Sequence, residues 1–261
     1  MKNLLIIGDS FAQRRCNLSW ISLLGNRLDA KVYGIGLPGQ SWWKQWEWYQ
    51  SNSKNLPDAS ETTIIWVHTS AHRLPCETDA RINPWVLFID DHNDPSNDIL
   101  PQSDPDGKLF KIAKDFYSSP LYVEKFYAWA MIAWWKELNL ELSKFHKVIH
   151  LFGFYDLGVN DTDRLLLRST NSIVVDGPSL GALSKADKPS FEGGATDNRI
   201  NHFNEHNNEQ LSKFLAVVVN NTQPNLIIQI DNLDDWQFED KLFNVKNKFF
   251  RYGTFFKDFK K

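Results

Sequence analysis

The sequence predicts an α/β fold, a three-layer sandwich in which helices cover both faces of a parallel central sheet. Short runs of consecutive apolar residues, each bounded by turn residues, are typical of strands that are buried on both faces. Segments with apolar residues at helical spacing lie between these runs, and strands that alternate with helices pair in parallel. The 261 residues, 42% of them hydrophobic, suffice for a single domain with a substantial core.

The first unit is predicted to be a strand, a tight turn and a helix. Residues 4–7 are a continuous apolar run, and residues 11–28 carry apolar side chains at helical spacing. Residues 31–33 predict a second strand, which a glycine-rich turn follows. Ser41 then predicts the N-cap of the next helix.

The later elements continue this alternation around one long insertion. Further strands are predicted at residues 62–67, 147–152, 172–175 and 225–230, and a helix at 205–219. Between the third and fourth strands, residues 75–107 are rich in Pro, Asn and Asp, and residues 108–145 predict one or two long helices. We therefore expect a helical insertion over about residues 75–145.

Charge and hydropathy exclude several classes of partner. The 29 basic and 32 acidic residues give a formal net charge of −3, whereas a general nucleic-acid binder would show a basic excess. The longest apolar run, residues 126–135, is too short to span a bilayer, and the apolar N-terminus is too short for a signal peptide. We expect no nucleic-acid or membrane partner. Synthesis in the cytoplasm is expected, which is compatible with release by lysis or incorporation into a virus particle.

Gly8-Asp9-Ser10 stands where the first strand ends and the first helix is predicted. Open parallel sheets bind their ligands at the carboxyl ends of the strands. A serine at this place has its hydroxyl exposed to the ligand, and its N–H lies near a helix N-terminus, which favours developing negative charge. The alternative is that Asp9 and Ser10 only cap the helix.

A serine nucleophile needs a general base, and the best candidate is His202, just before the last predicted helix. Asp197, five residues earlier, could orient its imidazole, which is the logic of a catalytic triad. His206 lies one helical turn further on and is expected to be a solvated helix residue. The pairs His202/His206 and His68/His72 have an i, i+4 spacing, but neither has an evident third ligand, so we expect no metal.

Residues 34–39, Gly-Ile-Gly-Leu-Pro-Gly, match the glycine pattern of dinucleotide-binding turns. The match follows the second predicted strand and not the first, and the next strand ends in His68 where a ribose-binding acid would be needed. A dinucleotide site is therefore a weak interpretation, and no cofactor is expected. A backbone N–H that points into the strand-end cleft explains the turn as well, with Gly39 as a second oxyanion donor.

Eleven Trp residues are unusual for this length, and four of them fall between residues 42 and 48. On a helix, Trp42, Trp46 and Tyr49 share one face, and Trp43 lies on another. This cluster has two interpretations: packing against the insertion, or a platform on which sugar rings stack. The aromatic residues of the predicted insertion helices are expected to be core.

Three blocks in order resemble the SGNH/GDSL hydrolase superfamily. They are Gly8-Asp9-Ser10-Phe11, the glycine turn that ends in Gly39, and the Asp197/His202 pair that runs into a helix through His202-Phe203-Asn204. The resemblance implies a flavodoxin-like SGNH fold over residues 1–221, insertion included, with residues 222–261 as a C-terminal appendage packed on the same domain. It also implies ester hydrolysis through an acyl-enzyme. Ser10 would be the nucleophile, His202 the base and Asp197 its orienter, with the Ser10 and Gly39 amides as oxyanion donors.

Two features depart from the pattern of the family. Its third block usually supplies an Asn after the third strand, whereas this chain has no Asn there, and Thr69, Ser70 or Arg73 could donate instead. The family includes members with a third block like this, many of them in bacteriophage genomes. Its acid normally lies three residues before the His, where this chain has Arg199. Either the loop bulges and still brings Asp197 to His202, or the backbone orients the imidazole without a carboxylate.

Two functions of different classes follow from these observations. The resemblance implies a serine esterase, whose substrate could be an O-acetyl group on a carbohydrate, with Asp9 and Trp42 among the residues near the substrate. The rival is an inactive descendant of the fold that binds a glycan or a protein partner through its aromatic surfaces. The altered third block and the displaced acid are what the rival predicts.

Overall fold

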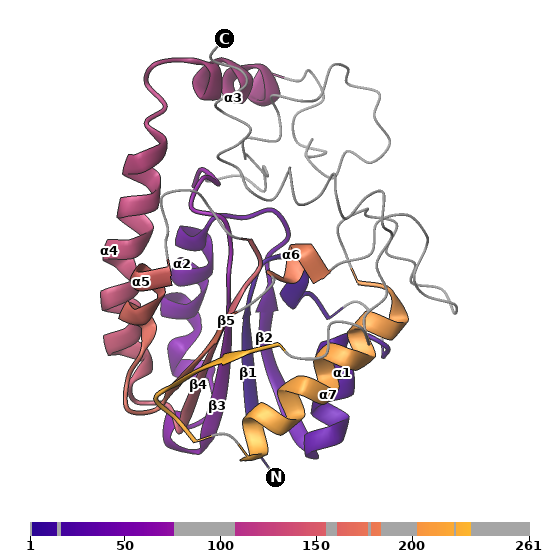
Figure 1. Ribbon diagram of the computed structural model, residues 1–261. Coiled ribbons are helices and arrows are strands. Elements are labelled where there is room, and N and C mark those ends of the chain that lie inside the picture. The colour runs from indigo at the N-terminus through magenta and orange to yellow at the C-terminus, as the bar shows by residue number, and fades with distance from the viewer. Residues whose placement is uncertain are drawn as a thin grey trace.

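The computed structural model describes residues 2–14, 17–75, 108–154, 161–176, 179–183, 203–221 and 223–230. In this part of the chain a parallel sheet stands between two layers of helices (Figure 1). The strands are β1 (Lys2–Gly8), β2 (Ala30–Gly36), β3 (Thr62–His68), β4 (Lys147–Phe152), β5 (Ser172–Asp176) and β6 (Leu226–Gln229). They confirm the predicted strands and the α/β class.

The strands follow one another across the sheet in the order β2-β1-β3-β4-β5-β6, and every pair is parallel. Strand β1 lies between β2 and β3, so the direction in which strands are added reverses at β1. Ligands of doubly wound sheets bind in the crevice at such a reversal, beyond the carboxyl ends of the strands. The sheet therefore places the end of β1, and with it Ser10, at the most favourable position for a site.

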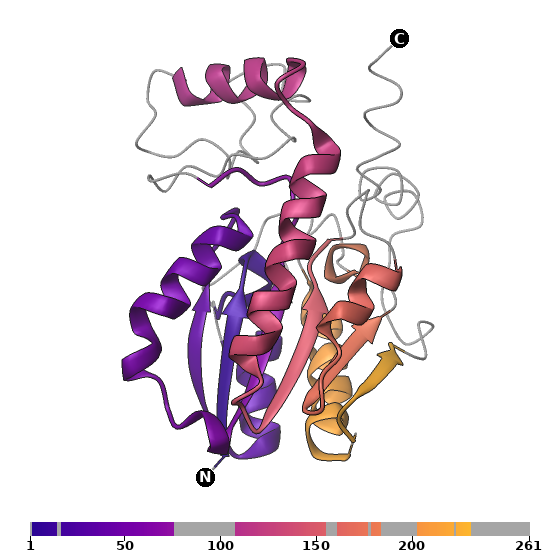
Figure 2. The same ribbon diagram turned by 90° about the vertical axis from the view of Figure 1, so that its left-hand side faces the viewer.

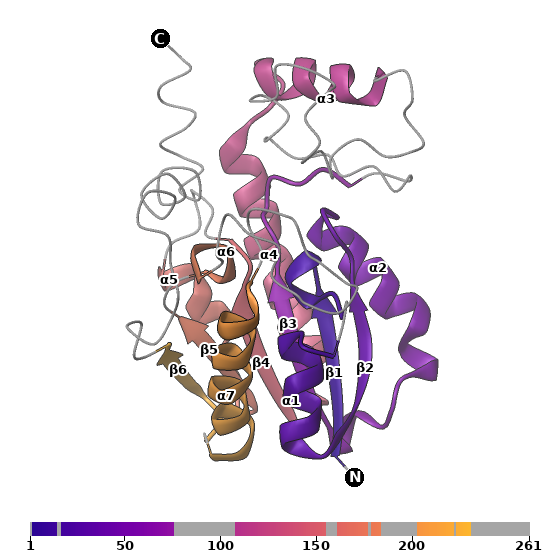
Figure 3. The ribbon, with the colours of Figure 1, turned by 90° about the vertical axis from the view of Figure 1, so that its right-hand side faces the viewer.

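Helices cover both faces of the sheet. Helices α1 (Trp20–Leu28) and α7 (Glu205–Asn221) lie on one face (Figure 3), and α2 (Trp42–Asn52) and α4 (Glu124–Leu142) on the other (Figure 2). Alternate residues of β1 enter the two apolar cores, Leu4 and Ile6 on the α1/α7 side and Leu5 and Ile7 on the α2/α4 side. Burial on both faces explains why the central strands, such as β1 and β3, are largely continuous apolar runs.

The helix predicted over residues 11–28 is shorter than expected and begins only at Trp20. Residues Ser10–Ala12 form instead a single turn of 3-10 helix. The side chain of Ser19 accepts a hydrogen bond from Ser22 N and is the N-cap of α1. The prediction for residues 11–19 was wrong because the caps decide where each helix begins. Asp9 binds a backbone N–H of the 3-10 turn, and Ser19 binds one of α1.

The insertion consists, in its described part, of two helices, as predicted. Helix α3 (Lys108–Ser118) precedes α4, and α3 lies beyond the carboxyl end of the sheet in all three views (Figures 1–3). Short helices α5 (Asp161–Arg164) and α6 (Leu180–Leu183) flank β5. None of the helices within the described ranges is long and apolar enough to cross a membrane.

Strand β6 lies in the segment that was predicted as an appendage from residue 222. It pairs in parallel with β5 and forms the edge of the same sheet, with Val174 opposite Ile227. The predicted strand over 225–230 is thus confirmed. The aromatic and basic tail from residue 231 onward lies outside the described residues.

Candidate functional site

The turn after β1 is closed by the carboxylate of Asp9. Asp9 Oδ1 accepts a hydrogen bond from Phe11 N at 3.0 Å and so caps the 3-10 turn that begins with Ser10. The capping interpretation is therefore supported for Asp9, although the element it caps is the short 3-10 turn and not α1. Ser10 is 8% exposed, and neither its hydroxyl nor its N–H is hydrogen-bonded to any described residue. This is the state in which a serine hydroxyl is available for a reaction.

The glycine turn after β2 lies directly beside the Ser10 turn. Gly8 and Gly36 are opposite each other in the sheet, and Leu37 N donates to Gly8 O at 2.8 Å. Gly39 has a φ of 70°, a left-handed conformation that favours glycine. Its N–H has no acceptor among the described residues. The two predicted oxyanion donors thus belong to neighbouring turns, each with an unengaged amide.

A buried ion pair joins the turn after β1 to the loop after β3. Arg73 Nη1 and Thr69 Oγ1 each lie 3.1 Å from Asp9 Oδ2 and donate to it. Asp9 is completely buried and Arg73 is 6% exposed. The side chains of Thr69 and Arg73, two of the three residues predicted to replace the family's Asn, are thus bound to Asp9. The third, Ser70, accepts a hydrogen bond from His72 N at 3.2 Å.

A chain of ring contacts runs from this ion pair to the start of the last helix. The Arg73 guanidinium carbon lies 4.8 Å from the centre of the Phe154 ring. The Phe154 ring meets Phe11 edge-on at 5.7 Å, and Phe11 lies 5.6 Å from Phe203. The predicted base His202, which directly precedes Phe203 in the sequence, and its partner Asp197 lie outside the described residues.

A second histidine that sequence reasoning missed pairs with His68. His68 Nε2 and His150 Nδ1 are 3.0 Å apart, and the rings of His68, the last residue of β3, and His150, within β4, stack with both side chains buried. Burial, and then the neighbouring His150, holds the pKa of His68 well below its usual value, and burial lowers the pKa of His150 to about 3. The pair is therefore neutral at pH 7, and the tautomers of the two rings decide which nitrogen donates across the contact. The parallel alternation of β3 and β4, which places both residues on one face of the sheet, was the available signal.

The insertion is attached to the loop after β3 through His72. Tyr117 of α3 donates to His72 O at 2.6 Å, and the hydroxyl of Tyr122 lies 2.6 Å from His72 Nδ1. His72 and His68 therefore have separate partners. In the described residues there is no group of three His, Cys, Asp or Glu side chains that could hold a metal ion.

The Trp-rich helix α2 uses most of its aromatic residues for packing. The Trp42 ring stacks on Trp134 of α4 with 4.8 Å between centroids, and Trp46 meets Trp134 edge-on. Tyr49 is completely buried, whereas Trp43 is 45% exposed. The packing interpretation is thus supported for the face that carries Trp42, which lies against the insertion as expected.

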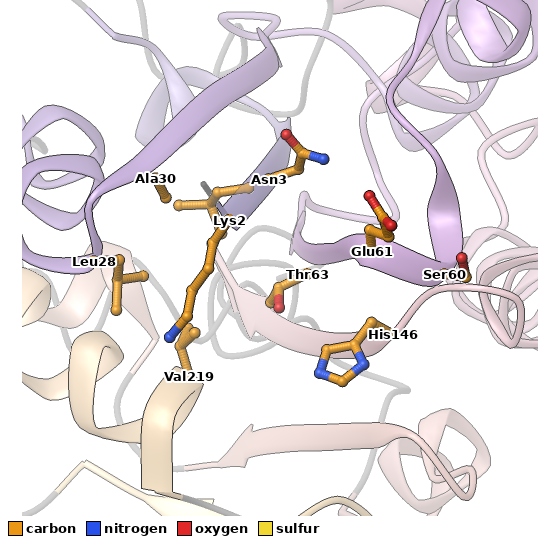
Figure 4. Close-up of a pocket in the computed structure, with 10 residues that line it drawn as sticks. Lys2, Asn3, Leu28, Ala30, Ser60, Glu61, Thr63, His146 and Val219 are labelled. Atoms are coloured by element: carbon orange, nitrogen blue, oxygen red, sulfur yellow. The ribbon is translucent and has the colours of Figure 1, made fainter.

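A cavity of about 310 Å³ lies at the opposite edge of the sheet, among the amino ends of the strands (Figure 4). Lys2, Glu61 and His146 are among the residues that line it. The Lys2 ammonium donates to Asn220 Oδ1 at the end of α7, where a cation stabilises the helix dipole. The amino edge is not where parallel sheets bind substrates, so this cavity is separate from the candidate site at Ser10.

Comparisons with known proteins add no relative: no protein-family model, no curated protein and no solved structure matches the chain.

Proposed function

We propose that the chain is a serine esterase of the SGNH type that hydrolyses carboxylic esters through an acyl-enzyme, with Ser10 as nucleophile. His202 is the general base and Asp197 orients it. The N–H groups of Ser10 and Gly39 stabilise the oxyanion. No metal or cofactor takes part.

The contact between Phe11 and Phe203 is the observation that carries this proposal. Each ring belongs to the residue that directly follows a proposed catalytic residue, and the ring centroids are 5.6 Å apart. The contact therefore holds the turn of Ser10 beside Phe203, the residue that follows His202 in the sequence. Phe11 and Phe203 are remote in sequence, and their contact supports the proposal because a nucleophile and its base must lie close together.

The sheet supports the same proposal. The order β2-β1-β3-β4-β5 is that of flavodoxin-like sheets, and Ser10 lies where the strand order reverses. The Ser10 hydroxyl has no hydrogen-bond partner among the described residues, whereas the carboxylate of Asp9 is bound by Arg73 and Thr69 and is therefore a poor candidate for the base.

The mechanism follows from these roles. His202 takes the proton of the Ser10 hydroxyl as Ser10 Oγ attacks the ester carbonyl, and the two N–H groups bind the oxygen as it becomes negative. His202 then gives the proton to the departing alcohol, which leaves the acyl group on Ser10. A water molecule, activated by the same imidazole, releases the acid and restores the hydroxyl.

We further propose that the natural ester is an O-acetyl group on a carbohydrate. Support comes from the exposed Trp43 at the start of α2, which follows the Gly39 turn. An exposed indole face can stack on a sugar ring, and Trp43 lies only four residues from one proposed oxyanion donor.

Hydrolysis of a short-chain aryl acetate by the wild type and by Ser10→Ala tests the proposal. Activity should disappear in Ser10→Ala while the melting temperature stays near that of the wild type, because the Ser10 hydroxyl makes no hydrogen bond to the described residues. Ser41→Ala is the matched control, since it removes a serine hydroxyl that caps α2. It should cost about 0.5–2 kcal/mol of stability and leave the rate unchanged.

The alternative is a binding module without activity. The observation in its favour is that the side chains of Thr69 and Arg73 donate hydrogen bonds to Asp9, whereas an esterase of this family would use a side chain of this loop to bind the oxyanion. Absence of hydrolysis by the folded wild type, across several acyl lengths, would contradict the esterase and make a glycan-binding screen the next experiment.

A further inference from the structure

We propose that Arg73 is a positioning residue for the reaction at Ser10, an inference that rests on the proposed function. Arg73 Nη1 lies 3.1 Å from Asp9 Oδ2 and 3.5 Å from the main-chain oxygen of Gln40. Asp9 directly precedes Ser10, and Gln40 directly follows Gly39. A single guanidinium nitrogen therefore links the two turns whose N–H groups would bind the oxyanion.

The Arg73 link lies where the distance between the Ser10 turn and the Gly39 turn decides whether both N–H groups reach the oxyanion. The hydrogen bond from Leu37 N to Gly8 O joins the turns where the strands end, and Arg73 joins them further along the chain. An oxyanion is stabilised only by donors at about 2.7–3.1 Å from its oxygen. A small displacement of one turn against the other would remove one of the two hydrogen bonds.

The ion pair between Arg73 and Asp9 contributes more to the fixed geometry of the two turns than to the stability of the fold. Asp9 is completely buried and Arg73 is 6% exposed, so both charges have lost most of their hydration. A buried ion pair often contributes no more stability than apolar side chains of the same volume would. Its hydrogen bonds are directional, however, and water does not compete with them, so the pair restricts where the two turns can lie.

The neighbours of the pair hold both of its groups in place. Thr69 Oγ1 donates to the same carboxylate oxygen, and the guanidinium lies 4.8 Å above the Phe154 ring. A Cβ atom at Gly153 would lie only 3.2 Å from Asp9 Oδ2, so the missing side chain leaves room for the carboxylate. Through Phe154 the guanidinium also touches the ring chain that leads to the segment of the proposed base.

Arg164 offers a matched control within the same chain. It is 8% exposed, forms an ion pair with Asp176, and its guanidinium carbon lies 5.3 Å from the centre of the Phe152 ring. Its ion pair is to β5 and involves neither the Ser10 turn nor the Gly39 turn. Arg164→Met and Arg73→Met therefore remove the same kind of interaction, and only the second should affect the proposed oxyanion donors.

The experiment measures kcat and KM for an aryl acetate, together with the melting temperature, for both variants. In Arg73→Met, kcat should fall about 10- to 100-fold while KM changes less than about twofold, because the lost interaction acts mainly in the transition state. Phenylboronic acid, which forms a tetrahedral adduct with a reactive serine, should bind correspondingly more weakly. Arg164→Met should lose thermal stability and keep both kcat and the boronate affinity.

A wild-type kcat in folded Arg73→Met would overturn the inference and leave the esterase standing. Equal loss of kcat in both variants would also overturn it, since Arg73 would then be only structural. If Arg73→Met does not fold, Arg73→Gln decides, because it keeps a polar side chain but is shorter and uncharged, so it does not link Asp9 to Gln40. A lowered kcat at constant KM supports the proposal and a wild-type kcat contradicts it. Failure of the wild type to hydrolyse the ester refutes the proposed function first, and the inference with it.

Discussion

The ring of Phe11 lies against the ring of Phe203, with 5.6 Å between centroids and 51° between ring planes. The contact joins the turn after the first strand to the segment before the last long helix. Phe11 is further held by Trp20, whose indole N–H donates to Phe11 O at 2.7 Å. Asn208 of α7 in turn accepts from Trp20 N, so the two segments share a network as well as a ring contact.

If this contact positions the proposed base, Phe203→Leu should lower the esterase kcat by about tenfold at a cost of roughly 1 kcal/mol in stability. Phe145→Leu is the control, because Phe145 is equally buried but lies in the core on the other face of the sheet. It should lose similar stability and keep its kcat. Equal effects of both substitutions on kcat would show that the Phe11–Phe203 contact has no special role.

The proposed acid and base should contribute unequally. His202→Ala should lower kcat by about 10⁴-fold or more. Asp197→Asn should keep a kcat roughly 10 to 100 times higher than that of His202→Ala, because an imidazole that lacks its orienting carboxylate still accepts a proton. Steady-state kinetics of both variants measure the difference. Equal losses would make Asp197 a full member of a triad, whereas an unchanged rate in Asp197→Asn would leave the orientation of His202 to the backbone.

The buried pair His68/His150 predicts acid sensitivity of the fold. Both pKa values are lowered in the folded state, that of His150 to about 3, so below pH 6.5 the unfolded chain binds more protons than the folded one. The stabilisation is complete above pH 6.5 and is lost as the pH falls toward 3. His150 alone should lower the stability at pH 5 by about 2 kcal/mol, and His68 should lower it further in the same direction.

Urea denaturation at pH 7.5 and pH 5 measures this effect. The double variant His68→Gln/His150→Gln keeps polar groups that do not titrate, and its stability should fall less between the two pH values than that of the wild type. His146→Gln, at an exposed histidine, is the control and should show the wild-type fall. A double variant with the same pH dependence as the wild type would contradict the assignment of acid sensitivity to this pair.

Gly36 should tolerate no side chain. A Cβ atom there would lie 2.3 Å from Gln13 N and 2.4 Å from the carbonyl carbon of Ala12, both backbone atoms of the segment that follows Ser10. Gly36→Ala should therefore displace the Ser10 turn, cost about 1–3 kcal/mol, and lower esterase activity more than stability alone explains. The control Gly25→Ala meets a methyl group of Val32 and should leave the rate unchanged. An active, stable Gly36→Ala would show that the Ser10 turn need not pack on β2.

The sequence by itself determined the elements and much of their order. Continuous apolar runs predicted the central strands β1, β3 and β4, because a strand buried on both faces needs apolar residues at nearly every position. Ser41 was correctly identified as the cap of α2, since capping is a local interaction between near neighbours in the chain. The start of α1 was misplaced because apolar spacing alone does not register the competing turn that Asp9 closes. The Ser10 turn was found from its place between a strand and a helix.

Only the tertiary structure decided which distant side chains meet. The partner of Asp9 is Arg73, that of His68 is His150, and that of His72 is Tyr122. Each of these contacts depends on strand order or on the course of the insertion, which are set by packing of the whole sheet and leave no local pattern in the chain. For the same reason the sequence offered Thr69, Ser70 and Arg73 as equal candidates, whereas the fold binds two of them to Asp9 beside the proposed nucleophile.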